Sequence, residues 1–391
     1  NAAFATLTES GGDITIDANT PTITSATISG GTAKVGTAIT LTVVADAAGY
    51  TLSAGTLNAV AVTGFSDDSG GTYTMTYTVV EGNSDRAAGA TPVSIVLNDG
   101  ENTNSAHTTL VESSAQTIDA NSPGATITSS TVSSGASTAT AAIALAFNTG
   151  ESTTDFDVDD ITASGCALTS FAGSGSSYTA TCTASSDGTP TVTISSGTFN
   201  DGAGNDNTVS NTYTWTYDGT ALTIVIASST SGVTSGSTTN DATIALTFTI
   251  SESTTGFEAD DVTVSGGTLS AFDGSGTAYT ATFAPSADGA TSISVAAGTF
   301  TDAVGNSNTV SNTFAWTYDG TGPTVAITST ASDPASSSTI AVTITFSEST
   351  SNFVNSELTL SGATSSLSGS GTTYTATLTP SADGTVTVDI A

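Results

Sequence analysis

Positive charge is almost absent from this chain. Its 391 residues include only 2 basic ones, Lys34 and Arg86, against 35 acidic residues, and the formal net charge is −33. Binding to phosphate backbones and to anionic membrane surfaces depends on Lys and Arg, so this composition excludes nucleic acid and an anionic membrane surface as partners. Nearly all of the carboxylates must therefore be solvated or must bind cations.

Long hydrophobic runs are also missing. The longest, residues 141–147, has the length of a strand, whereas a membrane-spanning helix needs roughly 18 apolar residues. We expect no membrane insertion in this region. The first residues lack both the basic and the apolar segment of a signal peptide, so we expect any export signal to have been removed, to be C-terminal or to lie outside this sequence.

The scarcity of histidine limits the catalytic chemistry. His107, the single histidine, lies in a segment that also occurs at the N-terminus with Phe4 in its place, and a position shared with Phe favours packing over catalysis. The Gly-Ser-Gly turns lack the Lys and the following helix of a phosphate loop. Carboxylate pairs of the glycosidase type arise by chance among so many acids. The sequence predicts that the chain is not an enzyme.

Internal repetition is the main positive feature. A segment with Glu-Ser-Thr at its start, Gly-Ser-Gly in the middle and Asp-Gly at its end begins at Glu151, Glu252 and Glu348. Between copies the chain carries Asp followed by Ala or Gly and small polar residues, a pattern that cannot continue a sheet and indicates short linkers. These aspartates recur about every 100 residues, the size of an immunoglobulin-like sandwich, at Asp17, Asp119, Asp218 and Asp319.

The apolar pattern within a repeat has a period of two. Ile244, Leu246 and Phe248 alternate with Ala or Thr, which is typical of a strand with one buried face, and helical spacing is not sustained anywhere. The sequence therefore predicts an all-β fold of tandem immunoglobulin-like sandwiches that form an elongated rod. Gly-Ser-Gly at 173, 274 and 369 is predicted to be a hairpin turn.

The repeats define predicted domain boundaries. They place a first domain at 17–118, a second at 119–217, a third at 218–318 and a fourth at 319–391. Residues 1–16 resemble the last strand and exit linker of the first domain, so we assign them to a preceding sandwich, and the fourth domain lacks its last strand. We expect a window of a longer array; the alternative is a head-to-tail fibre in which one copy donates a strand to the next.

The three sister segments, of which the last begins "FSEST" at Phe346 and continues "GSGTTYTATLTPSADG", resemble the bacterial immunoglobulin-like repeats of large secreted adhesins and biofilm-matrix proteins. The first domain is similar to a second subtype of these repeats. The resemblance implies a non-catalytic, extracellular structural region at the cell surface, such as the stalk of an adhesin, a fibre or a surface layer. Its partners would be neighbouring repeats or copies of the same protein. The alternative is a module that binds a surface glycan or protein, with the first domain as the candidate.

Oxygen donors recur at one end of each predicted sandwich. The start of the first strand, the end of the second and the loop between the last two strands meet there, and calcium takes six to eight oxygen ligands. We predict calcium at the domain junctions, the alternative being solvated turns. The candidate ligands are Asp17, Asp46, Asp99 and Asn102 in the first domain, Asp119, Glu151, Asp201 and Asn205 in the second, Asp218, Glu252, Asp302 and Asn306 in the third, and Asp319 and Glu348 in the fourth.

The two cysteines replace a Gly and a Phe of the next repeat. Cys166 corresponds to Gly267 and Cys182 to Phe283, on the runs that flank Gly-Ser-Gly. A metal site would need more ligands and free thiols are unusual in an exported chain, so we expect a disulfide. Closing a loop of this size would stabilise the domain by about 3 kcal/mol in the chain-entropy model.

Overall fold

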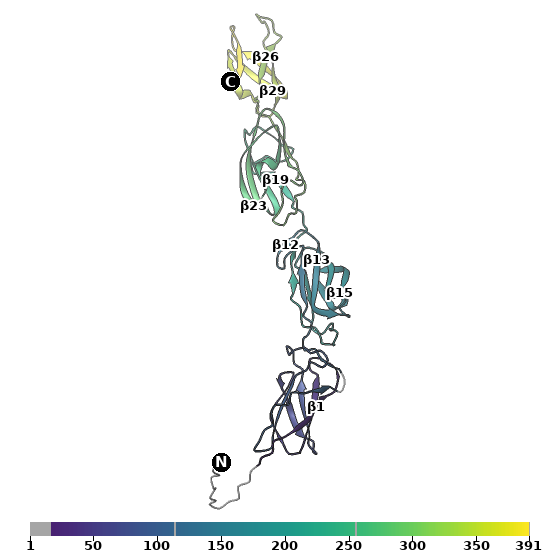
Figure 1. Cartoon of the computed structure of the whole chain (residues 1–391). Coiled ribbons are helices and arrows are strands. Elements are labelled where there is room, and N and C mark those ends of the chain that lie inside the picture. The colour runs from purple at the N-terminus through teal and green to yellow at the C-terminus, as the bar shows by residue number, and fades with distance from the viewer. Residues whose placement is uncertain (1–16, 113–114, 255, 391) are drawn as a thin grey trace, which may run out of the picture. The chain divides into compact units, whose positions relative to one another are not determined.

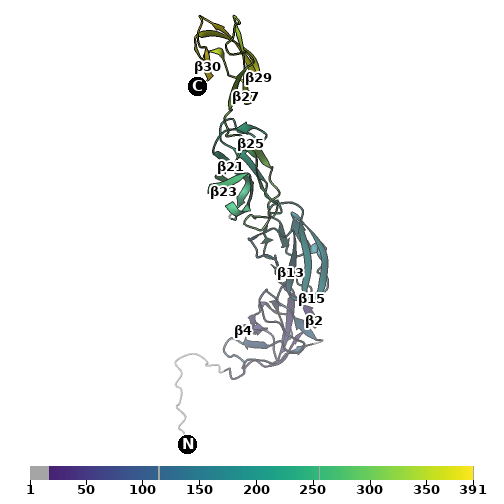
Figure 2. The same cartoon turned by 90° about the horizontal axis from the view of Figure 1, so that it is seen from above.

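The computed structural model describes residues 17–112, 115–254 and 256–390 (Figures 1 and 2). Strands make up its regular structure apart from three 3-10 helices of three residues each, and the predicted all-β class is confirmed. By its contacts the chain divides into two compact units. One runs to Thr220 and includes Val304–Asn306, and the other comprises Ala221–Ala303 with the residues from Ser307 onward.

Four hydrophobic clusters form in the described residues, one for each predicted domain, and Ala120 of the linker also packs in the first of them. The predicted domains are called repeats from here on. The strands bury one face through the predicted alternation. In β21 (Ile244–Thr254), for example, Ile244, Leu246, Phe248 and Ile250 are buried and Ala245 and Thr249 are exposed. Burial of this apolar face is the main contribution to folding, because the outward face carries mostly Thr, Ser and Ala.

The first repeat is built from three sheets, with the strand orders β6-β7-β3-β1-β9, β5-β4-β8 and β10-β2. The strands are β1 (Ile23–Ile28), β2 (Gly31–Ala33), β3 (Ala38–Ala45), β4 (Thr51–Leu57), β5 (Val60–Ala61), β6 (Thr63–Asp67), β7 (Thr72–Thr78), β8 (Val93–Asn98), β9 (Val111–Glu112) and β10 (Gln116–Ile118). Strand β2 pairs in parallel with β10, so the start and the end of this repeat lie side by side.

The second repeat has the sheets β11-β13-β15, β14-β16-β17 and β12-β18. Its elements are β11 (Thr126–Ser129), β12 (Ser137–Thr138), β13 (Ala142–Thr153), η1 (Val158–Asp160), β14 (Ile161–Ser164), β15 (Cys166–Ala184), β16 (Thr191–Ile194), β17 (Tyr213–Thr214) and β18 (Thr216–Tyr217). Strands β13 and β15 are long antiparallel partners that lie side by side in both views (Figures 1 and 2).

The third repeat follows the same plan, with the sheets β19-β21-β23 and β20-β25-β24-β22. Besides β21, its elements are β19 (Ile224–Ser228), β20 (Thr238–Thr239), η2 (Ala259–Asp261), β22 (Val262–Ser265), β23 (Gly267–Pro285), β24 (Gly289–Val295) and β25 (Phe314–Tyr318). The strand register is the same in the second and third repeats: Ile143 pairs with Cys182, and Ile244 pairs with Phe283 at the equivalent position.

The fourth repeat has the sheets β26-β27-β29 and β28-β30 in the described part of the chain. Its elements are β26 (Val325–Ser329), β27 (Ile340–Thr350), η3 (Asn355–Glu357), β28 (Leu358–Ser361), β29 (Ala363–Pro380) and β30 (Thr387–Ile390). Val388 and Ile390 are half-buried, whereas their counterparts Ile293 and Val295, beside β25, are 0% exposed. The second sheet of the fourth repeat is therefore less covered than that of the third.

The Gly-Ser-Gly segment lies inside a long strand that folds back on itself. In β15 the Thr179 hydroxyl donates to the Ala172 carbonyl across the bend (3.4 Å), and Gly173 and Gly175 have φ of 148° and 66°. A Cβ at Gly173 would lie 2.4 Å from the Ser177 carbonyl oxygen. Only glycine fits there, so the predicted turn residues have a steric cause although the structure contains one bent strand rather than two separate ones.

A second glycine is required by an aromatic ring. A Cβ at Gly267 would lie 2.4 Å from both Phe283 Cζ and the Ala284 carbonyl oxygen. We expect Gly267→Ala to lower the free energy of unfolding of the third repeat by about 1–3 kcal/mol, because the ring and the backbone must move. Gly256→Ala is the matched control in the same repeat, since a Cβ there meets nothing within 4 Å. Equal denaturant midpoints for the two variants would contradict this packing.

Candidate metal centre and linker contacts

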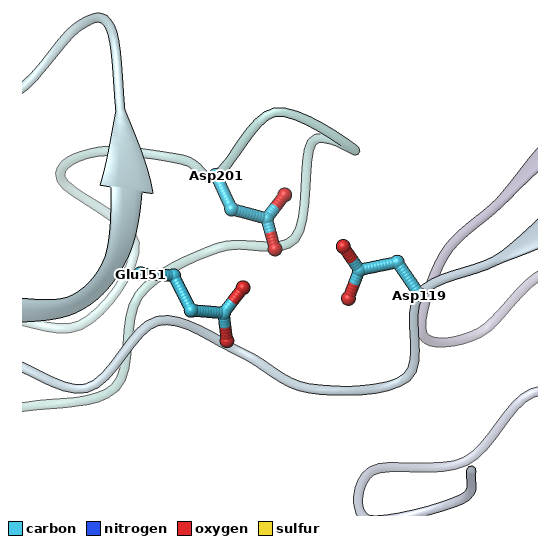
Figure 3. A group of neighbouring side chains, drawn as sticks. All are labelled: Asp119, Glu151 and Asp201. Carbon is cyan, nitrogen blue, oxygen red and sulfur yellow. The ribbon is translucent and has the colours of Figure 1, made fainter. Parts of the chain in front are cut away.

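Three carboxylates converge where the first repeat ends and the second begins. Asp119, Glu151 and Asp201 each place a carboxylate oxygen within 4.8 Å of the others, and their side chains point toward one another (Figure 3). Asp201 is buried, while Asp119 and Glu151 are half-buried. Of the four ligands predicted for this repeat, the structure thus brings the three carboxylates together. The fourth, Asn205, lies beside them.

Each carboxylate comes from a different part of the fold. Asp119 directly follows β10, and its N–H donates to the Ala33 carbonyl of β2 (2.9 Å). Glu151 lies near the end of β13. Asp201 lies in the loop that leads toward β17, where its Oδ1 accepts the N–H groups of Ala203 (2.8 Å) and Asn205 (2.9 Å). The loop and the strand end therefore belong to the second repeat, and Asp119 is the first residue of the linker.

The three charges destabilise one another in the absence of a cation. Burial raises the pKa of Asp119, and the nearby charges of Asp201 and Asp85 raise it further. Burial likewise raises the pKa of Glu151, with the charges of Asp119 and Asp201 acting in the same direction. A raised carboxyl pKa means that the ionised form is disfavoured in the folded state, so a bound cation would remove a cost that exists at neutral pH.

Asn205 presents its amide nitrogen, not its oxygen, to the carboxylates. Its Oδ1 accepts the Val35 N–H (2.8 Å), and its Nδ2 donates to Asp201 Oδ2 (2.8 Å) and to Asp119 Oδ1 (3.2 Å). This orientation satisfies a backbone N–H and two carboxylates at once, and the reverse orientation would satisfy none of them. Asn205 therefore orients the acidic group and does not offer it an oxygen.

The calcium ligands predicted in the third and fourth repeats are brought together only in part. In the second unit, Glu252 and Asp302 bring carboxylate oxygens within 4.8 Å of each other, while Asp218 and Asn306 belong to the first unit. The Asp319 N–H donates to the Thr239 carbonyl (3.0 Å). Within the described part of the chain the Asp319 and Glu348 side chains are not grouped with other acids, and calcium at these positions stays a prediction.

The carboxylates of the first repeat have protein donors. Asp46 accepts the Thr22 N–H (2.9 Å) and the Tyr50 hydroxyl (3.1 Å). Asp99 accepts the N–H groups of Glu101 (3.0 Å) and Asn102 (2.7 Å). The hydrogen bond from Thr22 makes the largest contribution to the lowered pKa of Asp46, and the bond from Asn102 makes the largest contribution to that of Asp99. Asp17 contributes its backbone carbonyl, which accepts from Asn102 Nδ2 (3.3 Å). Calcium at this set also stays a prediction.

A carboxylate from the preceding repeat holds each linker. Asp187 accepts the Gly219 N–H (2.7 Å) and the Thr220 hydroxyl, and Asp288 accepts the Gly320 N–H (2.6 Å) and the Thr321 hydroxyl. This role was not predicted from the sequence, although the recurrence of these aspartates was an available signal for it.

The linker between the first and second repeats is also held by carboxylates of the repeat before it, but these lie at positions that do not recur in the other repeats. The Ala120 N–H donates to Asp85 Oδ1 (2.8 Å), and the Ser122 N–H and hydroxyl donate to the Glu81 carboxylate (3.1 and 2.7 Å). Neither Glu81 nor Asp85 belongs to a repeated motif, so the sequence offered no sign of them. The linker is thus anchored to the preceding repeat independently of the acidic group.

Acid should release the linker contact of Asp187. The bonds from Thr220 and Gly219 hold the pKa of this carboxyl below its usual range. A lowered pKa stabilises the fold above the pKa of the unfolded chain, and this contribution disappears as the pH falls through the lower folded value. We expect NMR titration to give an Asp187 pKa below about 3.9 and the Gly219 amide shift to follow it. Titration at the ordinary value would contradict the contact.

The disulfide lies within β15. Cys166 and Cys182 are bonded, with an S–S distance of 1.94 Å and a Cα–Cα distance of 5.7 Å, and the bond joins the two halves of the bent strand. Cys182 is 0% exposed and belongs to the core of the second repeat. The disulfide therefore occupies the position that the Phe283 ring has in the third repeat.

Comparison with known proteins identifies the repeats. The family model described as bacterial Ig-like domain matches residues 119–217, 218–318 and 319–391. None of the curated proteins matches the chain. Among the described residues no helix has the length and apolar character needed to cross a membrane.

Several solved structures match the chain. The crystal structure of invasin, a bacterial integrin-binding protein, is 13% identical with a TM-score of 0.36, and the alignment covers 95% of this chain and 76% of that one. An I-band fragment of titin is 9% identical with a TM-score of 0.30, and the alignment covers 77% of this chain and 99% of that one. Because the family model matches most of the chain as three consecutive domains, the chain belongs to the bacterial Ig-like domain family.

Proposed function

We propose that this chain is a non-catalytic structural region of an extracellular bacterial surface protein, a spacer of Ig-like domains with calcium bound at a domain junction. The observation that carries this proposal is the convergence of Asp119, Glu151 and Asp201 at the start of the second repeat. A cation bound there would join the linker to the strand end and the loop of that repeat. Such a joint serves to set the direction of one domain relative to the next.

The chemistry of the donors supports calcium. All three side chains offer carboxylate oxygens, which are the ligands that Ca²⁺ prefers, and zinc or copper would favour imidazole or thiolate. Both cysteines are bonded to each other, and the ring Nε2 of His107 lies 2.9 Å from the Thr109 carbonyl oxygen, away from this group. Calcium would supply positive charge where burial and repulsion disfavour ionised carboxylates.

The repeat architecture supports the structural role. Each repeat has its own core, and the linkers after the first, second and third repeats are anchored by carboxylates of the repeat before them. Consecutive domains of about 100 residues allow a chain to span a long distance, and a uniform negative charge opposes the association of one chain with another. Binding of a glycan or protein by the first repeat stays a prediction from the sequence.

Calcium titration of the full chain tests the proposal. We expect isothermal titration after removal of divalent ions to show calcium binding, and Glu151→Gln to lose one bound ion. Asp206→Asn is the matched control: it also removes one carboxylate, from the loop that carries Asp201, but Asp206 is exposed and accepts from Asn200 (3.1 Å) outside the triad.

Thermal unfolding gives a second measurement. A ligand at a hundredfold excess over its Kd stabilises the folded state by about 2.7 kcal/mol, so calcium should raise the melting temperature of the wild type and of Asp206→Asn more than that of Glu151→Gln. Identical melting curves in chelator and in millimolar calcium would refute calcium binding at this junction.

A further inference from the structure

One hydrogen bond recurs at the start of three repeats. An asparagine in a loop near the end of each of these repeats donates its side-chain N–H to the backbone carbonyl of the linker aspartate about 85 residues earlier in the chain. The pairs and their Nδ2–O distances are Asn102 with Asp17 (3.3 Å), Asn205 with Asp119 (3.3 Å) and Asn306 with Asp218 (2.9 Å). The contact uses the main chain of the linker, so it does not depend on the charge of the aspartate.

In the second repeat, the side chain of this asparagine, Asn205, also contacts the first repeat. Asn205 is 2% exposed, and its Oδ1 accepts the N–H of Val35, which follows β2. Both residues lie in the first compact unit. A neighbouring bond reinforces the contact, because Lys34 Nζ, from the only lysine of the chain, donates to the Gly204 carbonyl of the same loop.

The buried position makes this contact expensive to lose. Removal of the Asn205 side chain would leave the half-buried Val35 N–H and the Asp119 carbonyl without this partner, and the desolvation cost of an unsatisfied buried group exceeds the net gain from an ordinary hydrogen bond. Lys34 is exposed, so its single bond contributes less.

We propose that these loop asparagines are positioning residues that fix each linker through its Asp carbonyl, and that Asn205 in addition docks the second repeat on the Val35 N–H of the first, with or without a bound cation. Asn205 then acts in both directions along the chain: its nitrogen holds the linker and its oxygen holds the preceding repeat. The docking surface on the first repeat is the segment Lys34–Val35.

Amide hydrogen exchange of Val35 in the full chain tests the docking, with chelator present throughout. We expect the Val35 amide to be protected in the wild type, and Asn205→Ala to accelerate its exchange by about tenfold while the amides of β3, in the core of the first repeat, stay unchanged. Asn102→Ala is the matched control, because Asn102 holds the Asp17 carbonyl and should leave the Val35 amide protected.

Asn205→Asp combined with Asp201→Asn separates the two halves of the contact and leaves the number of carboxylates in the group unchanged. The carboxylate at position 205 can still accept the Val35 N–H and can accept an N–H of the amide at position 201, but it can no longer donate to the Asp119 carbonyl. Val35 should therefore stay protected while NMR relaxation shows increased motion of the Asn121 amide. If Asn205→Ala unfolds the second repeat, this variant carries the test alone.

Three results would overturn the proposal: fast Val35 exchange in the wild type, equal exchange in Asn205→Ala and the wild type, or loss of Val35 protection when Asn205→Asp is combined with Asp201→Asn. All are measured in chelator, so none depends on whether calcium binds. Conversely, failure of calcium binding in the titration above would leave the docking contact untouched.

Discussion

Replacing Trp316 with alanine should lower the free energy of unfolding of the third repeat by about 3–5 kcal/mol, whereas phenylalanine should cost less than about 1.5 kcal/mol. The indole is 3% exposed, and its ring centroid lies 4.7 Å from that of Phe283 and 5.5 Å from that of Phe314. Alanine would leave a cavity among these rings, and a phenyl ring would fill most of it.

The small cost expected for phenylalanine has a specific reason. The buried Trp316 Nε1 has no hydrogen-bond partner among the described residues, and the same is true of Trp215 in the second repeat. An indole N–H that is buried without an acceptor makes no bond that a phenyl ring would lose. Denaturant unfolding with a probe in the third repeat would measure both changes. A Trp316→Phe variant as unstable as Trp316→Ala would contradict this expectation.

Exchanging the core residues of two repeats should also have a large effect. Cys166→Ala with Cys182→Ala should destabilise the second repeat by about 3 kcal/mol, because the disulfide closes a loop with a sequence separation of 16 residues. Cys166→Gly with Cys182→Phe, the pair found in the third repeat, should recover part of this loss, because the ring would fill the space beside Trp215 as Phe283 does beside Trp316.

Trp215 is the only tryptophan of the second repeat, so its fluorescence in a Trp316→Phe background reports the unfolding of that repeat alone. The reciprocal change, Gly267→Cys with Phe283→Cys, is the control and should form a disulfide in the third repeat. Equal unfolding free energies for the Ala-Ala and Gly-Phe variants would show that the ring cannot replace the disulfide.

The sequence predicted the fold class through two signals that act locally. Alternation in segments such as 244–250 specifies which face of a strand is buried, and the recurring Gly-Ser-Gly marks a bend that only glycine can adopt. The disulfide between Cys166 and Cys182 was expected because a metal site would need more ligands and free thiols are unusual in an exported chain, whereas the contact between their counterparts Gly267 and Phe283 is seen only in the structure.

The candidate site was predictable in part. Asp119, Glu151 and Asp201 recur at fixed positions in a known type of sandwich, so their convergence could be expected from the sequence pattern. The orientation of Asn205 could not be predicted from the sequence. The end of an amide that faces a carboxylate depends on a third group, which here is the Val35 N–H of the first repeat. Glu81 and Asp85 were missed because the first repeat shares no motif with the others at these positions.

The parallel pairing of terminal strands has a mechanical consequence. Strand β2 pairs with β10, β12 with β18 and β20 with β25, in each case a strand near the start of a repeat with one near its end, running in the same direction. Tension applied to the two ends of a repeat pulls such a pair along its length in opposite directions. The hydrogen bonds between the two strands then bear the load together in shear and cannot be opened one after another, so these short pairs would be the force-bearing element of the first three repeats.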